Sequence, residues 1–263
     1  GVGDAVVWRV LRELSVRASA EWATRLPAFE ELFGDGVLRS ANRAIEPERS
    51  LNLNLALSLS DLDTPLGRFG ATAWGFGRIT ENLILIEAGQ GRSRFVNVDS
   101  ATIYGVEGEL DWVSPGRYVQ ASAALTYEEG RNTSLEGELA RFRDDRLPNR
   151  PYLYGSASLT AGVSHLTVRG DRVEARAAGR WVQEFFQLWP SAGDPDTKAV
   201  IPEQLVVDVG VVYRFPLPLE PRPVLAMSLE SHNVLDARVF DQLGAERPGR
   251  SFHLKISGSY DGR

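Results

Sequence analysis

Three isolated histidines are the side chains best suited to bind a metal ion in this sequence. His165, His232 and His253 lack the i, i+4 spacing and the neighbouring carboxylates that are typical of a metal site. The chain contains no cysteine, which leaves neither a disulfide nor a thiolate site. We therefore expect neither a metal site nor a bound cofactor, and we interpret the histidines as ordinary polar residues.

Two pairs of adjacent acids, Glu128-Glu129 and Asp144-Asp145, could supply general acid–base chemistry. Such catalysis needs its partners within hydrogen-bond distance, and no histidine lies in the predicted long loops near these acids. The sequence also has no Gly-x-Ser-x-Gly elbow and no phosphate-binding glycine loop. These observations predict that the protein is not an enzyme.

The composition, with 43% hydrophobic and 24% charged residues among 263, falls in the ordinary globular range. A net charge of -6 without any basic block argues against binding to nucleic acid. No stretch approaches the roughly 18 apolar residues of a membrane-spanning helix, so a membrane role would require strands. The chain begins at Gly1 without an initiator Met and without the basic and apolar regions of a signal peptide, so we do not expect a whole gene product.

Alternation of apolar and polar residues with period two is the main pattern that could position these side chains. Leucine occupies every second position from Leu51 to Leu59, between Asn52, Asn54 and Ser58. A helix would repeat its apolar residues every 3.6 positions, so the pattern indicates strands with one apolar face. We predict ten strands, near residues 12–24, 50–60, 67–86, 96–113, 117–128, 152–164, 172–185, 204–215, 223–235 and 250–260.

The connections between the predicted strands alternate between short turns and long polar loops. The long loops follow the odd-numbered predicted strands, at residues 25–49, 87–95, 129–151, 186–203 and 236–249. This asymmetry is typical of outer-membrane β-barrels, which place short turns in the periplasm and long loops outside. Aromatic residues near strand ends would mark the membrane interfaces: Trp22, Trp112, Tyr127, Trp181, Tyr213 and Tyr260.

Charged residues on the polar phase of the strands should face the lumen of such a barrel, because charges facing lipid are costly. We expect a mainly structural role for them, through ion pairs with their neighbours. They are Glu107, Glu109, Asp111, Arg172, Glu174, Arg176, Arg180, Asp208 and Arg214.

The first long loop carries several spaced matches to one known motif: Arg25, Pro27, Glu31, Leu32, Phe33, Asn42, Pro47 and Glu48. This loop resembles that of TonB-dependent outer-membrane receptors. Further matches follow in the order of that family, at residues 104–107, 146–151, 233–236 and 248–252, so the resemblance covers essentially the whole chain. The sequence departs from the family at Arg43, where proline is usual, and at Tyr260, which precedes a polar tail instead of ending the chain.

The resemblance implies an all-β fold, an antiparallel transmembrane β-barrel in which about ten meandering strands form the carboxyl-terminal part of 22. Residues 1–263 would be a single, partial barrel domain in the outer membrane of a Gram-negative bacterium, surrounded by lipid. The family also has a plug domain, absent from this sequence, through which TonB drives uptake. The implied function is uptake of a scarce nutrient, with a ferric siderophore as the first choice and cobalamin or another ligand as further possibilities.

Receptors of this family bind their ligand at the outer face with the long loops and the plug, so the resemblance implies that ligand-binding residues lie in the long loops. Arg92 and Arg94 could attract an anionic ferric chelate, and Phe185, Phe186 and Trp189 could stack on an aromatic one. An alternative hypothesis is a self-contained barrel of about ten strands that acts as a passive pore or a surface-binding protein. A plug domain encoded upstream of Gly1 would favour the receptor, and a signal peptide directly before Gly1 would favour the small barrel.

Overall fold

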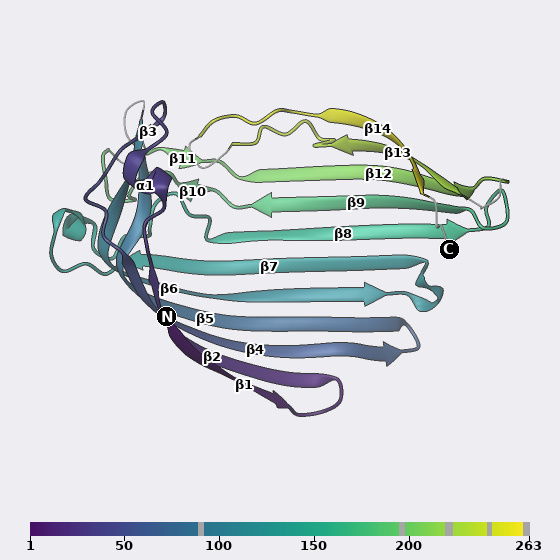
Figure 1. The fold of residues 1–263 in the computed structure, drawn as a ribbon, viewed down its shortest axis with the longest axis horizontal. Helices are drawn as coiled ribbons and strands as arrows, with labels where there is room; N and C mark the ends of the chain where they lie inside the picture. The colour runs from purple at the N-terminus through teal and green to yellow at the C-terminus, as the bar shows by residue number, and fades with distance from the viewer. Residues whose placement is uncertain (89–91, 195–197, 219–222, 241–243, 260–263) are drawn as a thin grey trace.

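Twelve strands form one sheet in the computed structural model, which describes residues 1–88, 92–194, 198–218, 223–240 and 244–259. Eleven of them pair antiparallel in chain order (Figure 1). These are β1 (Val2–Arg9), β2 (Leu14–Arg25), β4 (Glu48–Thr64), β5 (Gly67–Ala88), β6 (Ser93–Val113), β7 (Val119–Asn132), β8 (Leu153–Ser164), β9 (Arg172–Val182), β12 (Gln204–Pro216), β13 (Val224–His232) and β14 (Ser251–Ser259).

The smaller elements lie in the connections. The short strand β3 (Arg39–Ser40) pairs parallel with β6, and β10 (Phe185–Phe186) pairs with β11 (Val200–Ile201). Helical turns form α1 (Phe29–Phe33) and the two 3₁₀ segments Pro115–Arg117 and Glu138–Phe142. No helix among the described residues is long and apolar enough to cross a membrane.

The all-β antiparallel fold predicted from the sequence is confirmed, with two corrections. Strand β1 was not predicted, because its consecutive apolar residues Val6, Val7 and Trp8 break the period-two pattern. The loop predicted over 87–95 is strand at residues 87–88 and 93–95, because β5 continues to Ala88 and β6 starts at Ser93, and residues 89–91 lie outside the described residues. Tyr260 lies outside the described residues.

The register of the sheet divides it into an apolar and a polar face. Ala18 pairs with Leu55, Leu55 with Gly75, and Gly75 with Val106, and adjacent residues point the other way. The apolar face is uncovered, since 57% of Leu55, 63% of Leu110 and 60% of Leu229 is exposed. An exposed apolar surface of this extent marks a face that is buried by something outside the chain.

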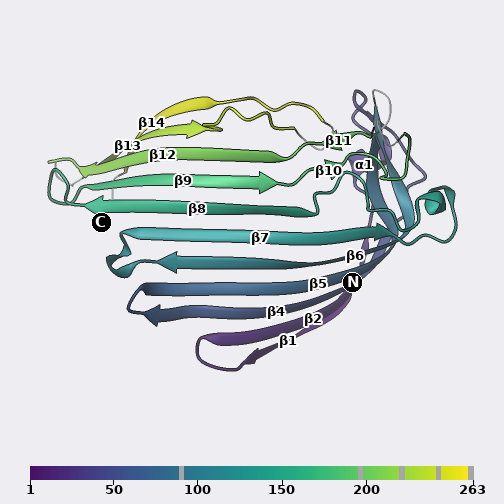
Figure 2. The ribbon, with the colours of Figure 1, turned by 180° about the vertical axis from the view of Figure 1, so that it is seen from behind.

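The long connections gather at one end of the sheet and the short turns at the other, as both views show (Figures 1 and 2). The loop end also holds the packed core of the described chain. There Leu83, Leu85, Val98 and Ile103 of β5 and β6 pack against loop residues that include Leu147. This core fixes the loops to the extended ends of β5 and β6.

The turn between β8 and β9 is organised by one buried carboxylate. Asp171, of which 1% is exposed, accepts hydrogen bonds from the backbone N–H groups of Leu166, Thr167 and Val168 at 2.7, 2.8 and 3.0 Å. The hydroxyls of Thr167 and Tyr213 also donate to it. These donors hold the pKa of Asp171 well below its ordinary value, with the Thr167 hydroxyl as the largest contribution.

Replacement of Val211 by Arg should impair membrane insertion far more than replacement of Val212 by Arg. Val211 is on the apolar face, and Val212 points to the polar face beside Glu174 and Ser228. A cation at mid-bilayer costs about 2–4 kcal/mol, whereas a cation in the lumen costs little. The folded fraction of each variant in outer membranes, read from heat-modifiable mobility, measures the difference. Equal insertion of both variants would refute the assignment of faces.

Acidification should loosen the β8–β9 turn. Because the pKa of Asp171 is depressed in the folded protein, its stabilising contribution is complete above the unfolded pKa of about 4 and is lost as pH falls through the lower folded value. Asp171→Asn should lower the unfolding temperature at pH 7 and remove part of the loss of stability below about pH 4. Thermal unfolding in detergent between pH 2 and pH 7 tests this, and identical pH profiles for both proteins would contradict it.

Candidate ligand-binding surface

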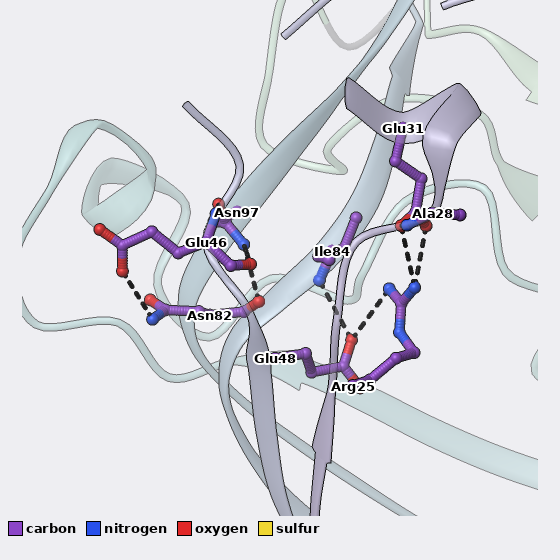
Figure 3. A network of polar contacts seen from close by, with 8 residues as sticks. All are labelled: Arg25, Ala28, Glu31, Glu46, Glu48, Asn82, Ile84 and Asn97. Carbon is purple, nitrogen blue, oxygen red and sulfur yellow. Dashed lines mark hydrogen bonds and ion pairs between the residues drawn. The ribbon is translucent and has the colours of Figure 1, made fainter. Parts of the chain in front are cut away.

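A three-residue ion cluster fixes the first long loop to the sheet (Figure 3). The guanidinium of Arg25, at the end of β2, donates to both carboxylate oxygens of Glu31 at 3.0 Å and to Glu48 of β4 at 3.4 Å. Glu48 also accepts from the backbone N–H of Ile84 at 3.2 Å, and Glu31 accepts from that of Ala28 at 2.7 Å. The two carboxylates are buried and each accepts from Arg25 and from a backbone N–H, so this part of the motif closes the loop at its base.

A second set of amide contacts holds the returning part of the same loop. Asn97 of β6 accepts from the backbone N–H of Glu46 at 2.8 Å and donates to the carbonyl oxygens of Glu46 and Asn82. Asn82 donates to the Glu46 carboxylate at 2.9 Å, and Figure 3 shows Glu46, Asn82 and Asn97 together. Asn42 donates to the carbonyl oxygen of Phe95. The role of Asn82 was not predicted, because its φ of 53° inside a strand leaves no mark in the apolar pattern.

The rest of the motif surrounds this cluster. Leu32 and Phe33 belong to α1, and the Leu32 carbonyl oxygen accepts from the N–H of Asn42 at 3.0 Å. Pro27 immediately precedes Ala28, the cap of α1, and Pro47 immediately precedes β4. The motif residues predicted from the sequence therefore lie at and around the base of the first long loop, where their contacts hold its conformation.

Two other loops are joined by an aromatic stack. The rings of Phe142 and Trp189 are 5.0 Å apart and nearly parallel, and Trp189 is 4% exposed. Asp145 accepts from the backbone and hydroxyl of Ser191 across the same boundary, at 2.9 and 2.6 Å. The connection over 133–152 and the segment 183–194 therefore pack against each other.

The residues that we proposed as ligand contacts have different surroundings. Arg92 is exposed, whereas Arg94 forms an ion pair with Glu87 on the neighbouring strand at 3.2 Å. Trp189 is buried in the loop core, Phe185 is buried in β10 outside that core, and Phe186 lies under the ammonium group of Lys198. Of these five residues, Arg92 alone combines exposure with a charge that forms no contact in the described chain.

The charges predicted to face the lumen share the polar face, but only some of them are paired. Glu174 binds Arg172 at 2.9 Å and also Arg214, and Arg180 binds Asp208 at 3.3 Å. Among the described residues, no ion pair or hydrogen bond is formed by the side chains of Glu107, Glu109, Asp111 and Arg176. Acidic residues on β6 and basic residues on β9 thus leave charge on the polar face for other groups.

Arg25→Ala should release the first loop. The substitution leaves the buried carboxylates of Glu31 and Glu48 close together without their cation. Because 43% of the Arg25 side chain is exposed, water screens the loss, and we expect a cost of about 1–3 kcal/mol in local stability. Trypsin cleavage after Arg39 and Arg43 should become about tenfold faster. Arg12→Ala, an exposed arginine in the β1–β2 turn, is the control, and equal cleavage of the two variants would contradict the role of the cluster.

Comparison with known families supports the same architecture. The model of the family described as "TonB dependent receptor-like, beta-barrel" matches residues 2–233. No curated protein matches the chain.

Solved structures of transporters share the fold. The copper transporter OprC is 22% identical with a TM-score of 0.70, over 96% of this chain and 37% of its own. The FrpB iron transporter from Neisseria meningitidis is 17% identical with a TM-score of 0.63, over 97% and 38%. BauA, the ferric preacinetobactin receptor from Acinetobacter baumannii, is 14% identical with a TM-score of 0.68, over 97% and 36%. The chain therefore spans less than two fifths of each of these structures. The family match over residues 2–233 shows that this chain belongs to the TonB-dependent receptor β-barrel family.

Proposed function

We propose that this chain forms part of the wall of an outer-membrane receptor that takes up a scarce nutrient with energy delivered through TonB. The observation that carries the proposal is the division of the sheet into an uncovered apolar face and a charged polar face. In a barrel, the first face contacts lipid and the second lines a lumen. The work of the chain is binding and passage of a ligand, and no chemical step is assigned to it.

The proposed mechanism starts from the hydrogen bonding of the backbone, which requires a closed barrel. Neighbouring strands from β1 to β14 satisfy one another through antiparallel hydrogen bonds, and closure into a barrel satisfies the two outer edges as well. The packed loops at one end meet a ligand that arrives from outside. A plug in the lumen, on which TonB acts, would then release the ligand to the periplasm, and both partners belong to the whole receptor.

The receptor is favoured over a self-contained small barrel by the direction of the edge strands. β1 and β14 are the first and the eleventh strands of an alternating antiparallel path, so they run in the same direction, and they do not pair in the described chain. Direct closure between them would create a parallel seam in an otherwise antiparallel barrel. Antiparallel closure needs an odd number of further strands between the two edges.

A ferric siderophore is the ligand that we propose first, with cobalamin or another metal complex as further candidates. The similar structures include an iron transporter, a copper transporter and a ferric preacinetobactin receptor. The exposed cation Arg92 at the loop end suits an anionic chelate.

Uptake assays in the native bacterium test the proposal. Deletion of the gene should abolish uptake of one labelled compound from a panel of ferric siderophores and cobalamin. Removal of TonB should abolish that uptake while surface binding of the compound is retained, because binding needs only the receptor and release needs energy. A passive pore would show uptake that is independent of TonB, and this result would overturn the proposal.

A further inference from the structure

A groove of about 420 Å³ lies on the polar face near the loop end, where β9, β12 and β13 approach the connection between β13 and β14. Its size is within the range of small-molecule sites, which is roughly 300–1,000 Å³. The groove is separate from the loop residues Arg92 and Arg94, and none of the comparisons assigns it a role.

The charged lining of the groove favours an anion. Two guanidinium groups, those of Arg180 and Arg247, line it together with a single carboxylate, that of Asp208. Arg247 is exposed, and its side chain forms no hydrogen bond or ion pair in the described chain. His232 adds an imidazole with Nδ1 at 3.7 Å from Asp208 and Nε2 at 3.8 Å from Glu230.

The single carboxylate is already engaged. Asp208 accepts from the backbone N–H of Asn233 through Oδ1 at 2.9 Å, and from Arg180 through Oδ2 at 3.3 Å. Glu230, the other acid beside His232, forms an ion pair with Lys255 at 3.4 Å. Arg247 therefore remains as an unneutralised cation at the groove, which can donate two parallel hydrogen bonds to a carboxylate or a similar oxyanion.

The groove also has an apolar part, and backbone contacts hold its edge in place. Val182, Val206, Phe185 and Phe240 supply its apolar surface. The backbone N–H of Phe240 donates to the side-chain oxygen of Gln204 at 2.7 Å, and the N–H of Arg247 donates to the carbonyl oxygen of Val239 at 2.7 Å. These two bonds hold the backbone of Phe240 to β12 and that of Arg247 to Val239, which reduces the ordering cost when a ligand binds.

We propose that this groove is a subsite for a small ligand with a flat apolar body and an anionic oxygen group that Arg247 binds. The inference rests on the proposed receptor function, and it places a ligand contact where the strands β9, β12 and β13 meet the last long connection. Arg180 contributes positive potential, and the aromatic rings accept the apolar part of the ligand.

Fluorine NMR of the purified whole receptor in detergent tests this, with 4-fluorobenzoate as the anionic probe and 4-fluorobenzamide as its neutral analogue. Benzoate should bind the unmodified protein at least fivefold more tightly than benzamide. Arg247→Gln should weaken benzoate binding about tenfold and leave benzamide binding unchanged, because one charge-assisted pair is lost.

Arg176→Gln is the matched control. It removes the same charge from the same face and from a side chain that likewise forms no contact, but it lies outside the groove, four residues along β9 from Arg180. We expect less than a twofold effect of this variant on benzoate binding.

Three results would overturn the subsite. The first is equal weakening of benzoate binding by Arg247→Gln and Arg176→Gln, and the second is equal affinity of the unmodified protein for benzoate and benzamide. The third is a lack of benzoate binding by the unmodified protein together with a lower unfolding temperature for Arg247→Gln. The last result would mean that another segment of the receptor fills the groove. Uptake assays on the same variants separate this inference from the proposed function. TonB-dependent uptake that survives in Arg247→Gln, together with unchanged benzoate binding, would reject the subsite and leave the receptor function intact.

Discussion

The continuous antiparallel ladder from β1 to β14 is the constraint on which the rest of the molecule depends. Each pair keeps a register that places leucine, valine and alanine on one face across the whole sheet, as in Val16, Leu57, Ala73 and Leu125. A slip of one residue at any pair would move these side chains to the charged face. The ladder therefore sets the apolar surface, the polar surface and the end at which the loops gather.

Strand ends are secured by carboxylates whose hydrogen bonds are satisfied inside the protein. Glu48 binds Arg25 and a backbone N–H of β5, Glu129 binds Arg131 and Arg146 while 2% exposed, and Asp171 organises a turn. Buried carboxylates suit a one-layer sheet, because such a sheet has no interior between two layers into which a loop could pack. A buried charge with enough donors fixes a connection where apolar area is scarce.

Some charged side chains of the polar face form ion pairs, and others form none among the described residues. Ion pairs stabilise the sheet around Glu174 and Asp208, whereas the acidic residues of β6 leave negative charge unneutralised. A surface of this kind is compatible with water and with transient partners, as the proposed passage of a ligand requires. Membership of the receptor family agrees with that arrangement, since the match covers most of the chain.

The sequence alone determined the strands, their facing and the family, because these depend on local period-two patterning and on spaced motif residues such as Arg25, Glu31 and Glu48. It failed at β1, where consecutive apolar residues hide the period, and at the hairpin of β5 and β6, whose polar tips look like a loop. Tertiary structure alone decided that Trp189 is buried, that Asn82 and Asn97 hold the first loop, and that Arg247 faces a groove. These outcomes depend on contacts between segments far apart in sequence, and no local pattern encodes them.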